Sequence, residues 1–137
     1  MRKLCLIMAV FISVVFGEQV IISNDIWYPN KDKDKVILNV KGDNKRTMGE
    51  ELVAGCIKYY KKKKRYRIGE EIKYYVRYID GNNLIASCKF GDYDRDFGIY
   101  DILVIWHNTY TTSYHQFMVI EDKQTKKLEM ELIYFRD

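Results

Sequence analysis

The regular alternation of apolar and polar side chains constrains the fold of this chain more than any other feature. In residues 72–78 every second side chain is isoleucine, tyrosine or valine, and lysine, tyrosine and arginine lie between them. A period of two residues is typical of a half-buried strand. The turn residues 80–83 follow, and 84–90 resume the extended pattern. These two segments therefore predict a β-hairpin.

Further segments on both sides of this hairpin predict more strands. Residues 99–106 are apolar apart from Asp101, which is typical of a central strand covered on both faces. Segments with strand-like patterns also occur at residues 20–28, 36–40, 113–121 and 128–135. The sequence therefore predicts a mainly β fold, an antiparallel β-sandwich or barrel of about seven to eight strands.

Residues 48–60 interrupt the β pattern and leave two interpretations open. Thr47 and Glu50 have the spacing of a helix-capping box. The apolar residues that follow fall on one helical stripe, namely Leu52, Val53, Cys56, Ile57 and Tyr60. Gly49 and Gly55 oppose a helix, because each costs about 1 kcal/mol there. If the helix forms, the fold becomes α+β, with one helix on an antiparallel sheet.

The N-terminus has the three parts of a secretory signal peptide. Arg2 and Lys3 supply positive charge, residues 4–16 are apolar except for one serine, and Val15 and Gly17 suit a cleavage site. The apolar run is shorter than the roughly 20 residues that span a bilayer. No later run is long enough for a transmembrane segment. We therefore expect a secreted, extracellular protein.

Cleavage after residue 17 leaves residues 18–137 as a single secreted β-rich domain. Cys5 leaves with the signal peptide, so that Cys56 and Cys88 remain. In an oxidising compartment two cysteines are expected to form a disulfide. Closing this loop stabilises the fold by about 3–4 kcal/mol on the chain-entropy account.

Residues 58–67 contain the densest positive charge of the chain, interleaved with tyrosines. Cations bind phosphate or sulfate, and rings stack or pack beside them. A secreted protein meets sulfated glycans or anionic surfaces instead of intracellular nucleic acid. The alternatives are a solvated loop that serves only solubility, or a dibasic cleavage site at residues 62–65. The candidate polyanion-binding residues are Tyr60, Lys61, Lys62, Lys63, Lys64, Arg65 and Tyr66.

Other constellations give weaker indications of chemistry. Asp101, His107 and His115 could form a hydrolytic or metal-dependent site if the fold brought them together. The acidic segment 92–98 fails the spacing of a calcium loop, because its glycine falls one position late and Leu103 stands where a glutamate is needed. We therefore predict a binding protein that is not an enzyme and needs no cofactor. A cystatin-like protease inhibitor is a further alternative, although the inhibitory Q-x-V-x-G motif has no counterpart.

Residues 72–120 also resemble a known family. The shared features are the strand Ile72-Lys73-Tyr74, the turn entry Tyr78-Ile79-Asp80, the glycine turns at Gly91 and Gly98, and the close Phe117-Met118-Val119-Ile120. This pattern resembles small secreted insect proteins described as multiprotein-bridging-factor-two-type transcription activators or probable salivary secreted peptides. The resemblance implies a small, secreted, β-rich, non-enzymatic protein.

Overall fold

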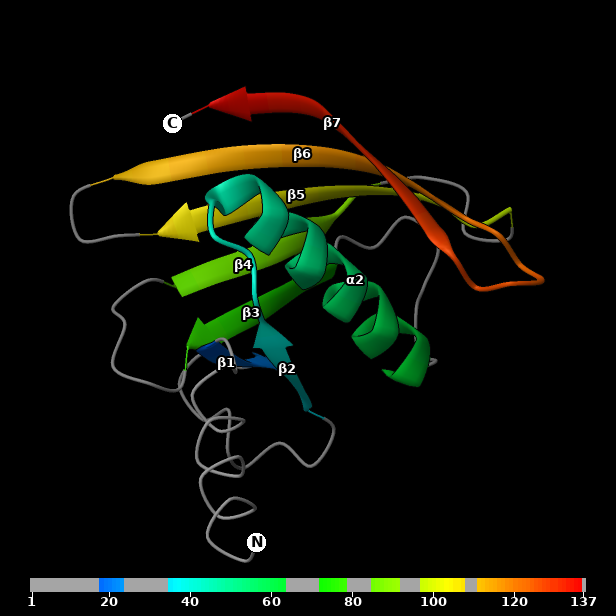
Figure 1. The fold of residues 1–137 in the computed structure, drawn as a ribbon, viewed down its shortest axis with the longest axis horizontal. Helices are drawn as coiled ribbons and strands as arrows, with labels where there is room; N and C mark the ends of the chain where they lie inside the picture. The colour runs from blue at the N-terminus through cyan, green and yellow to red at the C-terminus, as the bar shows by residue number, and fades with distance from the viewer. Residues whose placement is uncertain are drawn as a thin grey trace, which may run out of the picture.

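The computed structural model describes residues 18–23, 35–63, 72–78, 85–91, 97–107 and 111–136. It contains one antiparallel sheet with the strand order β2-β1-β3-β4-β5-β6-β7 and one helix, α2, placed between β2 and β3 in the chain (Figure 1). The elements are β1 (Glu18–Ser23), β2 (Val36–Val40), α2 (Lys45–Lys63), β3 (Ile72–Tyr78), β4 (Ile85–Phe90), β5 (Ile99–His107), β6 (Thr112–Glu121) and β7 (Leu128–Arg136).

The predicted mainly β fold is confirmed, and the helix on an antiparallel sheet is the arrangement found. The sheet curls into a half-barrel, and α2 lies across its concave face (Figure 1). The helix contacts β1, β2, β4, β5 and β6. A helix therefore covers the inner face that a second sheet would cover in a sandwich.

The apolar stripe of α2 forms the centre of the core. Tyr60 is partly buried and packs against the core as the sequence predicts, and Tyr59, which the predicted stripe does not include, is fully buried. The strand residues buried against it alternate along each strand, as the period of two requires. They include Val20, Ile22, Val76, Ala86, Ile102, Val104, Trp106, Phe117 and Val119.

The expectation that residues 99–106 form a strand covered on both faces is wrong. Every second residue of β5 is buried, and the residues between them are half-exposed. Leu103 and Ile105 lie on this outer face. The apolar run therefore belongs to a strand with one face in the core, and not to a strand covered on both faces.

The start of α2 differs from the predicted capping box. The Thr47 amide N donates to Asn44 Oδ1 at 3.0 Å, and the Asn44 amide N donates to Thr47 Oγ1 at 3.4 Å. Asn44 is therefore the N-cap, and Thr47 completes the reciprocal pair. Glu50 instead forms an ion pair with Arg46, one turn earlier, at 3.7 Å.

The two helix glycines lie where α2 approaches the sheet. A Cβ at Gly49 would lie 3.1 Å from Cζ of Phe117, and one at Gly55 would lie 2.7 Å from Cδ1 of Ile22. The absent side chains allow close packing, which explains why the helix tolerates two residues of low helix propensity.

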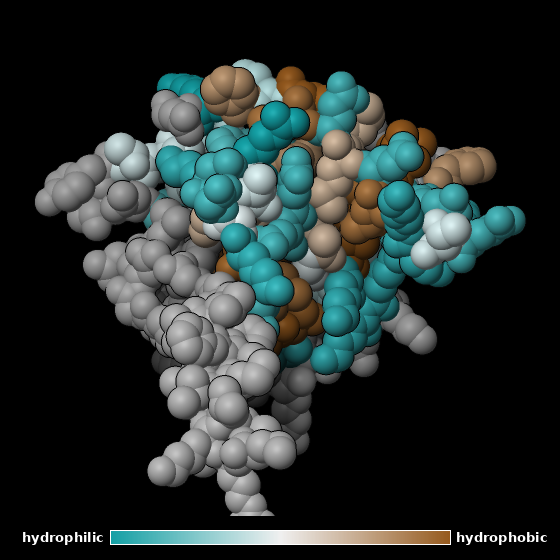
Figure 2. Space-filling model, viewed as in Figure 1, coloured by the Kyte–Doolittle hydropathy of each residue, from teal (hydrophilic) through white to brown (hydrophobic). Residues whose placement is uncertain are grey.

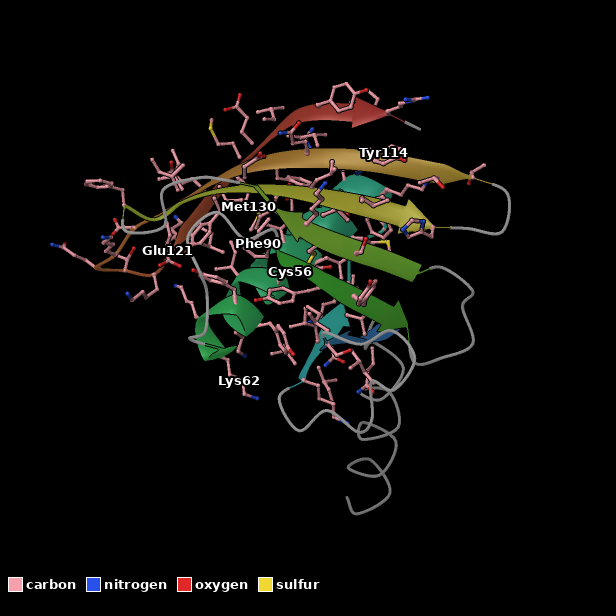
Figure 3. The ribbon with its side chains drawn as sticks, turned by 180° about the vertical axis from the view of Figure 1, so that it is seen from behind. Cys56, Lys62, Phe90, Tyr114, Glu121 and Met130 are labelled. Atoms are coloured by element: carbon pink, nitrogen blue, oxygen red, sulfur yellow. A yellow bond between two sulfur atoms is a disulfide. The ribbon has the colours of Figure 1, made fainter. Side chains whose placement is uncertain are left out.

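The predicted bridge between Cys56 and Cys88 is found. The two sulfurs lie at disulfide distance, the Cα atoms are 6.6 Å apart, and both side chains are fully buried. The bond joins the middle of α2 to β4, and Figure 3 shows Cys56 beneath the sheet.

Some expectations from the sequence concern residues beyond those described. They are the signal peptide at 1–17, the hairpin turn at 80–83 and most of the acidic segment 92–98. Within the described residues, no helix is long and apolar enough to cross a bilayer.

Candidate polyanion-binding site

The predicted basic run begins on the last two turns of α2. The structure describes the side chains of Lys58, Lys61 and Lys62, and the helix ends at Lys63. Lys64, Arg65 and Tyr66 lie outside the described residues. A helix C-terminus carries partial negative charge, which favours lysines there by about 0.3–1 kcal/mol each.

Lys61 forms an ion pair with Glu121 at the end of β6. The Glu121 side chain is only 7% exposed, so the carboxylate is nearly buried and its partner matters for the fold. The contact attaches the end of α2 to the sheet. Sixty residues separate the partners, and no pattern in the sequence connects them.

Tyr60 packs against the core instead of standing beside the lysines as a solvent-facing ring. Its ring centroid lies 5.4 Å from that of Phe90, with the planes inclined by 26°, and 6.3 Å from that of Tyr100. Such pairs add about 0.5–1.5 kcal/mol beyond area burial. Tyr60 therefore holds the end of α2 to β4 and β5.

Lys58 and Lys62 are exposed and lie one helical turn apart on the same side of α2. Lys62 Nζ lies 3.5 Å from the carbonyl oxygen of Lys35, just before β2. Figure 3 shows Lys62 extending away from the sheet at the end of the helix. We call Lys35, Lys58, Lys61 and Lys62 together the basic helix end.

A second group of lysines adjoins this site through the Lys61–Glu121 pair. The turn between β6 and β7 begins directly after Glu121. Its lysines are exposed, namely Lys123, Lys126 and Lys127. The Lys61–Glu121 contact thus joins the end of α2 to the strand end before a second lysine cluster, whereas Lys62 lies toward Lys35 and β2. The basic run at residues 58–67 gives no indication of this second cluster.

The alternative catalytic constellation does not converge. Asp101 and His107 share the outer face of β5, but six residues of strand separate them by about 20 Å. His115 is opposite Val104 and buried on the inner face. The Asp101 carboxylate instead accepts a hydrogen bond from Gln116 Nε2 at 2.9 Å. The three residues therefore cannot act as one hydrolytic or metal site.

Ser113, which lies two residues before His115, has a structural partner. Ser113 Oγ accepts a hydrogen bond from Lys45 Nζ at 3.0 Å, which links β6 to the first turn of α2. No group of three metal-ligating side chains occurs within the described part of the chain.

An open groove of about 740 Å³ lies between the first half of α2 and β7. Figure 2 shows hydrophobic atoms there, between the hydrophilic side chains of α2 and those of β7. The groove has an apolar wall that includes Leu128 and Met130. One of its three acidic residues, Glu51, accepts hydrogen bonds from the backbone amides of Lys41 and Gly42 at 2.9 Å each. The Glu51 carboxylate therefore fixes the backbone of residues 41 and 42, which lie between β2 and α2.

Comparison of the chain with protein-family models, with curated proteins and with solved structures gives no match.

Proposed function

We propose that the protein is a secreted, non-enzymatic binding protein that binds a sulfated glycan through the basic helix end and the adjacent β6–β7 turn. The observation that carries the proposal is the Lys61–Glu121 contact. Glu121 pairs with Lys61, the neighbour of Lys62 in α2, and directly precedes the turn that carries the exposed lysines 123, 126 and 127. An extended polyanion can contact both groups at once.

Helix stability alone does little to explain why exposed lysines gather at the C-terminal end of α2. The helix dipole favours lysines at the C-terminus by about 0.3–1 kcal/mol. Lys58 and Lys62, four residues apart, repel each other by about 0.2–0.5 kcal/mol. Among the described residues, neither lysine forms an ion pair with a carboxylate. A sulfated ligand would remove this repulsion and release bound counterions.

Heparin-affinity chromatography of the purified protein tests the proposal. We expect the variants K58Q/K62Q and K126Q/K127Q each to elute at lower salt than the wild type. The salt dependence of binding should also fall by about two counterions per variant, one for each lost cation. The matched control K41Q/R46Q removes two exposed cations near the start of α2 and should elute close to the wild type.

Two results would contradict the proposal. In the first, both test variants elute with the control. In the second, the protein binds phosphatidylserine vesicles but is not retained on heparin, which would make a lipid surface the ligand.

A further inference from the structure

The outer edge of β7 is open. β7 pairs with β6 on one side, and no other strand of the described sheet pairs with its second side. Figure 1 shows β7 along the upper boundary of the sheet. An exposed edge presents unpaired backbone N–H and C=O groups, which can pair with another strand.

The exposed hydrophobic side chains concentrate on this edge. Ile133, Tyr134 and Phe135 are 45%, 50% and 64% exposed. They are consecutive, whereas the other exposed large hydrophobic residues of the described chain are isolated in sequence. Scattered apolar residues are normal on a surface, but a contiguous group marks an interaction site.

A β-bulge changes which face the residues of β7 occupy. Leu132 is opposite Phe117 and Phe135 is opposite His115, and both opposing residues point into the core. Residues that face each other across a strand pair lie on the same face. Leu132 and Phe135 therefore share the inner face although they are three positions apart. Ile133 is the extra residue that shifts the alternation.

The two charged residues that flank this group, Glu131 and Arg136, both lie on the outer face of β7. Glu131 is opposite Met118, and Arg136 is opposite Tyr114. Both opposing residues lie on the half-exposed side of β6, where Figure 3 shows Tyr114. Glu131 and Arg136 are five positions apart and of opposite charge. The faces of β7 are thus mirrored about the midpoint between Ile133 and Tyr134.

We propose that β7 pairs antiparallel with β7 of a second copy, about a two-fold axis that passes between Ile133 and Tyr134. The facing pairs are then Ile133 with Tyr134, Leu132 with Phe135, and Glu131 with Arg136. The Leu132–Phe135 pair keeps inner residues opposite each other, and the Glu131–Arg136 pair keeps outer residues opposite each other. A regular strand could not pair about such a midpoint, because its odd offset would place opposite faces together.

The chemistry of the facing pairs favours a second copy over an unrelated strand. The two-fold axis repeats each contact, so that one dimer has two Glu131–Arg136 pairs and two Leu132–Phe135 pairs. The edge is therefore complementary to itself. Opposite charges meet, apolar side chains meet, and the residues of both these pairs lie on the same face of the sheet. Pairing covers the group of exposed hydrophobic residues.

Sedimentation velocity of the purified protein across a wide concentration range tests this dimer. We expect reversible dimerisation for the wild type. Either single variant, E131R or R136E, places like charges opposite each other twice and should raise the dimer dissociation constant about tenfold. The double variant E131R/R136E restores opposite charges and should recover dimerisation. E129R is the matched control, because Glu129 is exposed but lies outside the six-residue overlap.

F135S provides a test that leaves the charge unchanged, because it removes the exposed aromatic ring from the overlap. It should also weaken dimerisation, with an unchanged circular dichroism spectrum showing that the variant is folded. A wild-type protein that stays monomeric at every concentration would overturn the proposal. Single and double charge variants with equal dissociation constants would do the same.

Discussion

A single carboxylate organises the turn that joins β6 to β7. Asp122 Oδ1 accepts hydrogen bonds from the backbone amides of Thr125 at 3.2 Å and Gln124 at 2.8 Å. These two hydrogen bonds lower the pKa of Asp122 below its ordinary value of 3.8, and the bond from Thr125 has the larger effect. Both bonds favour the ionised form, since a carboxylate accepts a hydrogen bond more strongly than a carboxylic acid.

This depressed pKa makes the contribution of Asp122 to stability dependent on pH. The contribution is complete above the unfolded-state pKa, near 4, and is lost as the pH falls through the lower folded-state pKa. We therefore expect D122A to be less stable than the wild type at neutral pH. The difference in denaturant midpoint should shrink as the pH falls below about 4. A difference that stays constant from neutral pH to pH 2–3 would contradict this explanation.

At the scale of elements, the disulfide fixes α2 on the sheet. Cys56 faces the concave side of the sheet, and Cys88 occupies the core-facing row of β4. Tyr60 and Lys61 make the next contacts toward the helix end, with Phe90 of β4 and Glu121 of β6. The bridge and these contacts together determine where the basic helix end lies.

Removing the bridge should therefore lower both stability and order at the helix end. We expect C56A/C88A to lose about 2–5 kcal/mol of unfolding free energy, the usual loss for a native bridge in a small secreted domain. Chemical denaturation measures the change. Alkylation of the unreduced wild type in denaturant, where buried thiols become accessible, is the control and should modify neither Cys56 nor Cys88. Two modified cysteines in that sample would contradict the bridge.

The sequence predicts the elements better than their assembly. Local patterns located β2 and the β3–β4 hairpin, because alternation and turn residues are local signals. The cysteine count predicted the bridge. The predicted start of α2 was wrong because Thr47 belongs to two possible capping pairs. It forms the pair with Asn44, whereas Glu50 pairs with Arg46. Contacts between distant segments have no local signal.

The candidate site shows the same limit. Composition alone identified the lysines of residues 61–64, because their density is unusual. The sequence did not indicate that Tyr60 packs on Phe90, that Lys61 pairs with Glu121, or that the β6–β7 turn lies beside them. These facts depend on the curl of the sheet and the path of α2 across it. His115 also proved to be buried, on the face opposite to that of Asp101.

At the scale of the whole molecule, the two proposed surfaces occupy different parts of the fold. The basic helix end lies at the C-terminal end of α2, and the open edge of β7 bounds the sheet (Figure 1). A dimer formed through β7 would carry two basic helix ends. A long polyanion could engage both, so that the second contact forms at a high effective concentration.

Dimerisation should therefore increase binding to long glycans more than to short ones. We expect the wild type to bind full-length heparin at least about tenfold more tightly than a short heparin fragment, because two linked sites add avidity. F135S leaves the lysines in place, so it should bind the short fragment as the wild type does but lose most of the preference for the long chain. Isothermal titration calorimetry with both ligands measures the four affinities, and K58Q/K62Q should weaken binding to long and short heparin alike. If F135S were monomeric but kept the full preference, the length dependence would arise within one subunit, and the two surfaces would act independently.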